Sequence, residues 1–264
     1  MTQDVRSAAR SAGNHPIVEK GARLGYAMSG LIHLVIGWIG LKVAWGIDGG
    51  SDDADQSGAL ATVANTSTGP VLLWLAVAGF ALLSLWQLTE AVVGRHSDGM
   101  TDRLKALGKT VLYAVFAFTA FRVTQKAGGS SEETTDSLTA TIMSAPGGRV
   151  LVGLVGLGII GVGGYHAWKG WTCRFLEELD EDPGQAVEVA GRAGYVAKGV
   201  ALVIAGGLFV SAALSSRASE AGGLDASLKL VRDQPFGPYL LTVVAVGSGA
   251  YGIYSFGRAR HARL

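Results

Sequence analysis

Residues 23–37 read RLGYAMSGLIHLVIG, and residues 192–206 read RAGYVAKGVALVIAG. Both segments carry Arg, Gly, Tyr, Gly and Gly at the same offsets, so the chain repeats itself. A long apolar run with glycines at helical spacing is typical of a membrane-spanning helix that packs against other helices. Only the first run contains a histidine, His33, and a polar ring in such a run needs an explanation.

The composition favours a membrane protein. Hydrophobic residues make up 49% of the chain and charged residues 16%, against about 25% charged residues in a typical soluble domain. A bilayer is crossed by about 20 residues of helix, and six apolar windows reach that length: residues 24–46, 70–93, 107–125, 149–171, 192–214 and 237–257. The links between them leave no room for a catalytic domain. Residues 1–20 lack the apolar core of a signal peptide, so we expect them to form a flexible cytoplasmic tail.

The distribution of lysine and arginine predicts the orientation, because short loops rich in these residues stay cytoplasmic. The N-terminal tail, the 2–3 and 4–5 links and the C-terminus carry fifteen of them; the opposite side carries six, with Lys42 late in the first span. We therefore expect both termini in the cytoplasm. The net charge of +1 gives no reason to expect nucleic acid as a partner, and the single Cys173 excludes an internal disulfide.

The repeated unit is a helical hairpin. A shift of 80 residues moves the first span onto the third, and a shift of 169 moves it onto the fifth. The hairpins occupy residues 21–100, 101–185 and 186–264. Because each unit crosses the membrane twice, successive copies enter in the same direction and are related by an axis along the membrane normal. We predict an all-α integral membrane fold, with six transmembrane helices arranged as three parallel two-helix hairpin repeats about a pseudo-threefold axis. The outer link of the first repeat offers a short amphipathic helix with Ser57 as its N-cap.

Three features of these repeats resemble domain-of-unknown-function family 1206, membrane proteins of actinobacteria and cyanobacteria that contain three two-helix repeats. They are the Arg-x-Gly-Tyr-x-x-x-Gly openings at residues 23–30 and 192–199, the Tyr113 variant in the middle copy, and YGIYSFGRAR at residues 251–260. The resemblance extends from about residue 17 to the end of the chain. It implies the six-helix fold and a multi-pass location in the bacterial plasma membrane. It implies no activity and no functional residues.

The polar residues of the odd spans share one face. At 100° per residue, Tyr26, Gly30 and His33 lie on the small-residue side of the first span, away from the large apolar residues. Small residues let membrane helices approach closely, so we expect these faces to look inward. The resulting candidate intramembrane polar site consists of His33, Tyr113, Tyr26, Tyr195 and His166.

His33 has three possible roles. Its nitrogens could be used in an interhelical hydrogen bond, or it could serve a proton-linked or ligand-binding function, since ionisable groups within a membrane are costly. It could also ligate a metal or haem. Axial ligation would need a second histidine, and His166 of the fourth span would lie about 6 Å away in depth, given a rise of 1.5 Å per residue.

A second constellation is expected at the cytoplasmic side. Lys109 and Lys198 occupy the position of Ser29, and the even spans carry charged residues at matching places near their ends. The predicted charge ring, which could hold an anion or close a gate, consists of Glu90, Lys109, Lys198, Lys169 and Arg258. Lysine and arginine near helix ends also extend to lipid headgroups and fix orientation. The following FLEELDED, residues 175–182, is expected to be a solvated extension of the fourth span.

The motifs do not indicate an enzyme. GLVGLGIIGVGG, residues 153–164, lies inside a span and follows no strand, so it is not a nucleotide-binding loop. No catalytic Ser/His/Asp or Cys/His motif is present, and no cofactor is expected other than haem on His33 and His166. We expect a structural or accessory subunit that packs in the lipid bilayer against a larger membrane complex or as a homo-oligomer. The alternative is a small transporter or channel with a central pathway past His33 and Tyr113.

Overall fold

The computed structural model describes residues 16–47, 55–93, 100–125, 139–180, 182–215, 232 and 234–263, so residues 1–15 of the predicted tail lie outside it. The described elements are α2 (Pro16–Trp45), α3 (Gln56–Ala64), α4 (Gly69–Val93), α5 (Met100–Thr124), α7 (Gly148–Trp171), the 3-10 helix η2 (Arg174–Glu178), α8 (Gln185–Ser215) and α10 (Gly237–His261). Six of these helices are long and apolar enough to cross a membrane, in agreement with the six predicted spans.

The helices extend beyond the apolar windows at the predicted cytoplasmic side. α2 begins at Pro16, a residue suited to the first helical turn because it has no N–H to leave unpaired. Arg23 pairs with Glu19 one turn earlier, at 3.2 Å, and donates to the carbonyl of Arg260 at 2.6 Å. Hydropathy predicted that this span starts at residue 24, because a hydropathy window ends where the residues become polar although the helix continues.

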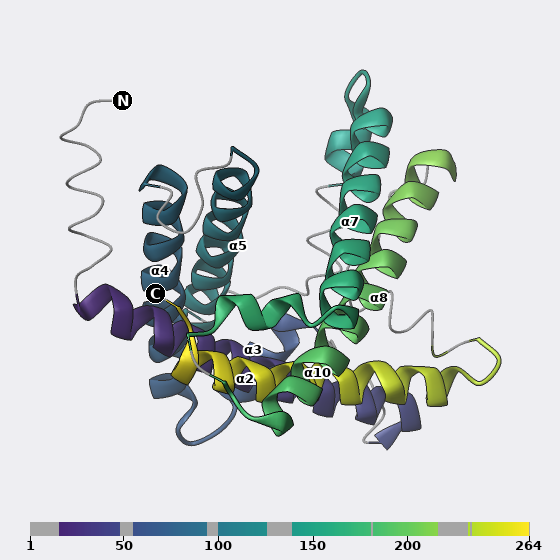
Figure 1. Ribbon diagram of the computed structural model, residues 1–264. Coiled ribbons are helices and arrows are strands. Elements are labelled where there is room, and N and C mark those ends of the chain that lie inside the picture. The colour runs from purple at the N-terminus through teal and green to yellow at the C-terminus, as the bar shows by residue number, and fades with distance from the viewer. Residues whose placement is uncertain are drawn as a thin grey trace.

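The long helices form three antiparallel pairs: α2 with α10, α4 with α5, and α7 with α8 (Figure 1). Each pair joins the first helix of one predicted repeat to the second helix of the preceding repeat, counted cyclically. The pairing uses equivalent small residues, since Gly30 approaches Gly252 of α10 and Gly199 approaches Gly163 of α7. In the middle repeat the equivalent is Thr110, whose carbonyl accepts a hydrogen bond from Ser84 of α4 at 2.9 Å.

The hairpins of the first and third repeats are also packed, because α2 contacts α4 and α8 contacts α10. At these interfaces Gly25 meets the backbone of Gly79, and Gly194 meets the backbone of Tyr251. The matching residue of α5 is Lys105, whose side chain prevents such an approach. In the described part of the chain, α5 and α7 share no comparable interface.

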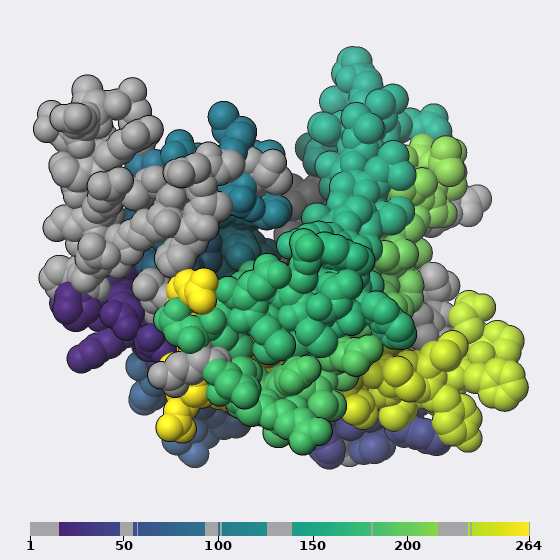
Figure 2. All heavy atoms as spheres, viewed as in Figure 1, coloured from purple at the N-terminus to yellow at the C-terminus, as the bar shows by residue number. Residues whose placement is uncertain are grey.

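The structure does not confirm an arrangement of three equivalent, parallel hairpins. The α4/α5 and α7/α8 pairs stand upright and apart on either side, while α2 and α10 run across the view (Figure 1). The space-filling view shows the same separation between the two upright pairs (Figure 2). The lack of a glycine contact between α5 and α7 leaves the two upright pairs joined mainly through α2 and α10.

Two predictions about the links are wrong. The N-cap of α3 is Asp55, whose side chain accepts a hydrogen bond from the Gly58 N–H at 3.0 Å; Ser57 lies inside the helix. The segment after α7 is not a solvated extension, because Cys173 has a φ of 55° and turns the chain into η2. Phe175 of η2 is fully buried, since an aromatic side chain removed from water outweighs the acidic character of its neighbours.

Candidate functional site

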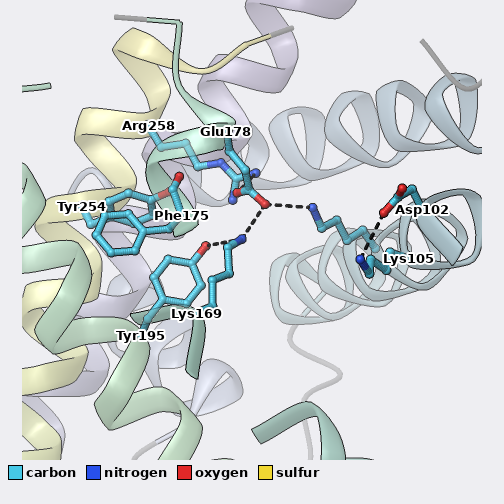
Figure 3. A network of polar contacts seen from close by, with 9 residues as sticks. Asp102, Lys105, Lys169, Phe175, Glu178, Tyr195, Tyr254 and Arg258 are labelled. Carbon is cyan, nitrogen blue, oxygen red and sulfur yellow. Dashed lines mark hydrogen bonds and ion pairs between the residues drawn. The ribbon is translucent and has the colours of Figure 1, made fainter. Parts of the chain in front are cut away.

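A network of ion pairs joins η2 to three long helices. Lys169 of α7 donates to Glu178 Oε1 at 2.6 Å, and Lys109 of α5 lies 3.5 Å from the same oxygen. Arg258 Nη2 of α10 lies 2.8 Å from Glu178 Oε2 as an ion pair without hydrogen-bond geometry. Figure 3 shows the cationic groups converging on this carboxylate. We call these four residues the Glu178 network.

Burial makes this network important for stability. The side chains of Lys169 and Arg258 are 9% and 8% exposed, whereas those of Glu178 and Lys109 are 24% and 39% exposed. A buried cation that loses its counter-ion is strongly destabilising. Glu178 therefore compensates the two buried cations, while Lys109 keeps contact with solvent.

Two apolar anchors position Glu178. Phe175 stacks on Tyr195 of α8, with ring centroids 5.3 Å apart, and meets the ring of Tyr254 of α10 at 5.1 Å. Leu179 is 5% exposed and forms an isolated antiparallel bridge with Ala262. Phe175, three residues before Glu178, and Leu179, the residue after it, are both held by packing. The position of the Glu178 carboxylate between α7 and α10 therefore does not depend on the ion pairs alone.

Tyrosine rings support the cations. Arg258 lies 4.2 Å from the ring centre of Tyr26, and Lys169 lies 4.9 Å from that of Tyr195. Cations over aromatic faces gain about 0.5–2 kcal/mol, more when desolvated. These contacts let two cations remain buried although a single carboxylate faces both.

The charges also control the ionisation of Glu178. Burial would raise the pKa of this carboxyl, but Arg258, Lys109 and Lys169 together hold its pKa well below the usual range. Glu178 is therefore ionised at neutral pH, and the network contains three positive charges and one negative charge.

The structure brings together only part of the predicted charge ring. Lys109, Lys169 and Arg258 meet at Glu178, while Lys198 lies 4.3 Å from the ring centre of Tyr251. Glu90 lies near the C-terminal end of α4, as its position in the repeat requires. Sequence reasoning missed Glu178 because its segment is acidic. The sequence signal that could have identified Glu178 is the pair of apolar residues Phe175 and Leu179. They are four positions apart, and Glu178 lies between them.

His33 uses its ring locally. Its Nδ1 donates to the carbonyl of Ser29, one turn earlier, at 2.8 Å. The ring packs on Tyr251 of α10 with centroids 4.6 Å apart. This hydrogen bond runs within α2, so the interhelical contact of His33 is a ring contact with α10.

His166 has the same local arrangement. Its Nδ1 donates to the carbonyl of Val162 at 2.9 Å, and its ring lies 5.7 Å from that of Tyr195. Tyr195 in turn packs edge-on against Tyr251, the partner of His33. The two histidines thus stand at opposite ends of a row of rings with two tyrosines between them, which does not fit axial ligation of a haem placed between the histidines.

The tyrosines of the predicted polar site lie in different surroundings. Tyr113 of α5 stacks with Phe80 of α4, with centroids 6.4 Å apart, whereas Tyr26 is 2% exposed beneath Arg258. His33 and its equivalent Tyr113 therefore each face the helix with which their own helix is paired. Over the described residues, no group of three or more His, Cys, Asp or Glu side chains could hold a metal ion.

The model of the family called Domain of Unknown Function (DUF1206) matches the chain three times, over residues 24–94, 104–172 and 193–262. The chain belongs to this family. The DUF1206 chain is also 27% identical over 252 residues to the uncharacterized protein YxxB of Bacillus subtilis (strain 168), with 91% of this chain and 90% of that protein covered. No solved structure matches it.

Proposed function

We propose that this DUF1206 protein is a structural or accessory subunit of a bacterial plasma membrane, with all six long helices spanning the bilayer and both termini in the cytoplasm. The three repeats would be hairpins about a pseudo-threefold axis, and the equivalent contacts of Gly30 and Gly199 support this plan. In a bilayer the α2/α10 pair would run closer to parallel with the two upright pairs than it does in Figure 1, while α5 and α7 would remain apart.

The observation that carries the proposal is that several charged and polar groups of the long helices are bound within the protein. Lys109, Lys169 and Arg258 share one carboxylate, and the Nδ1 atoms of His33 and His166 each donate to a carbonyl of their own helix. A transport pathway presents such groups to its substrate. Here the Glu178 network connects α5, α7 and α10 to η2, which favours a role in holding helices together.

The middle repeat offers the surface for a partner. Of the apolar windows of α5 and α7, 11% and 17% are buried, against 50% for α2 and 44% for α4 and for α10. Lipid covers such faces in a monomer, but small residues such as Gly161 and Gly164 also have open space in front of them. Membrane helices associate through small residues of this kind. A second copy or a membrane complex would pack on these faces.

The purified protein reconstituted into liposomes distinguishes the structural role from transport. We expect anion and proton flux equal to that of empty liposomes, and a particle larger than the 27.2 kDa chain when membranes are solubilised gently. Flux that is lost in His33→Gln while the unfolding temperature is unchanged would contradict the proposal and favour the pathway past His33 and Tyr113. A strictly monomeric particle without flux would contradict the accessory role.

A further inference from the structure

Among the described residues α5 and α7 have no packed interface. We call the region between Gly108 and Leu112 of α5 and Leu154 and Gly158 of α7 the α5–α7 seam. The alignment that matches Gly30 with Gly199 also matches Gly108 with Ala197, and the alignment of Glu90 with Arg258 matches Gly158 with Gly247. In the third repeat a Cβ on Gly247 would overlap the Ala197 side chain. At both Gly108 and Gly158 a Cβ would meet nothing within 4 Å. The middle repeat thus has open space where the third repeat has a helix interface.

The seam is apolar along its length and cationic at one end. Leu112 and Leu154 are 45% and 59% exposed. At the end that the proposed topology places in the cytoplasm, Lys105 and Lys109 lie one turn apart on α5, with side chains 49% and 39% exposed. Lys105 Nζ lies 5.7 Å from the ring centre of Tyr165 on α7, which shows that this side of α5 faces α7.

Among the described residues, this end of the seam carries excess positive charge. Lys105 pairs with Asp102 at 3.0 Å, but the Glu178 network behind it holds three cations against one carboxylate. Arg258 of that network is 7% exposed, and its Nε has no hydrogen-bond partner. The Nζ of Lys109 lies 3.5 Å from Glu178, at the limit of a hydrogen bond, and retains donors for another anion.

We propose that the α5–α7 seam binds one anionic phospholipid, with its phosphate on Lys105 and Lys109 and an acyl chain along Gly108 and Gly158. A gap between helices in hydrocarbon is filled by lipid unless protein fills it, and basic sites between helices on the cytoplasmic side select anionic headgroups. This inference depends on the topology proposed above but not on the accessory role. The lipid takes the place of the missing helix interface and joins α5 to α7.

The test uses the full chain in nanodiscs that contain equal amounts of phosphatidylglycerol and phosphatidylcholine, followed by native mass spectrometry of the released protein. We expect one phosphatidylglycerol per chain, enriched about 25-fold over phosphatidylcholine, since each of the two lysines contributes about five-fold to the affinity for an anionic surface. Equal retention of the two lipids, or retention of neither, would overturn the proposal. A large excess of inorganic phosphate should not displace the lipid; displacement would show that the site takes phosphate alone and would overturn the acyl-chain contact.

Matched variants locate the site. Lys105→Gln should reduce bound phosphatidylglycerol about five-fold, and Gly158→Leu should abolish binding by filling the seam. The controls are Lys20→Gln, an exposed lysine on α2, and Gly164→Leu, a glycine of α7 with open space on another face. Lys105 lies outside the Glu178 network, so its substitution leaves the fold intact, and an unchanged unfolding temperature verifies this. Equal lipid loss in the controls, or none in the seam variants, would contradict the assignment.

Failure of the topology would appear separately, as termini accessible to external protease in intact cells.

Discussion

The two helices of each hairpin are held together differently in the first and third repeats than in the middle repeat. In the first and third repeats, glycines such as Gly25 and Gly194 bring the helix backbones into contact. In the middle hairpin Lys105 replaces this glycine, and α5 reaches η2 and α7 through long side chains, as in the pair of Lys109 with Glu178. In the middle repeat, charge contacts at one end of the helices take the place of close backbone packing. The remaining length of α5 and α7 is therefore available to lipid or a partner.

The largest predicted effect comes from substitutions that disrupt the packed hairpins of the first and third repeats. Gly79→Leu and Gly247→Leu place a side chain against a neighbouring helix, so each should cost about 3 kcal/mol or more and reduce the yield of monodisperse protein. Gly158→Leu, at the equivalent position of α7, should change the stability by less than about 0.5 kcal/mol. Thermal unfolding in detergent measures all three. Equal destabilisation by Gly158→Leu would show that the seam is closed.

Next in size is the loss of the charge contact. Glu178→Gln should cost about 2 kcal/mol, because Lys169 and Arg258 lose the carboxylate that they share. The matched control is Glu177→Gln, whose side chain is 74% exposed and should lose less than about 0.5 kcal/mol. The same unfolding experiment applies. Two variants of equal stability would mean that the Glu178 network contributes nothing to the fold.

Acid should remove the same contribution. The pKa of Glu178 lies well below its usual range in the folded protein, so the stabilisation is complete above the unfolded value of about 4.3 and is lost as the pH falls through the folded value. The difference in unfolding temperature between the wild type and Glu178→Gln should therefore be constant from neutral pH to about pH 5 and narrow in stronger acid. A difference that grows on acidification would contradict the ion-pair assignment.

The smallest effect concerns His33. His33→Gln keeps a donor near the Ser29 carbonyl, whereas His33→Leu loses the bond and should cost about 1 kcal/mol. Both variants lie on the packed α2/α10 side, so neither should alter lipid bound at the seam. Unfolding temperatures measure the difference, and a larger loss in the Gln variant would assign His33 a role other than hydrogen bonding.

The sequence predicted the six long helices and the small-residue face of each odd helix, since hydropathy and a period of 3.6 residues determine both. It could not predict which helix that face would meet. Gly30 was expected to face inward, and the residue it packs on, Gly252 of α10, is not indicated by the pattern of α2. A periodic pattern identifies a face, but the choice of partner depends on contacts between distant residues such as Gly30 and Gly252.

The candidate site was predictable only in part for the same reason. The repeat alignment singled out Lys109, Lys169 and Arg258, because matching positions reach the same depth. Glu178 lies in a link that the first repeat does not match, and its acidic neighbours indicated solvent. The burial of Phe175 between two tyrosine rings depends on α8 and α10, which no local pattern of residues 175–182 reveals.

Disulfide formation across the two sides of α7 tests the central claim most directly. In a Cys173→Ser background, Gly153→Cys with Ala213→Cys should join α7 to α8 readily, because a Cβ on Gly153 would lie 3.5 Å from that of Ala213, within the range of a disulfide. Gly108→Cys with Gly158→Cys spans the seam and should remain reduced under the same oxidation in membranes. Oxidation of the second pair as fast as the first would show that α5 packs on α7 and would contradict the open middle hairpin.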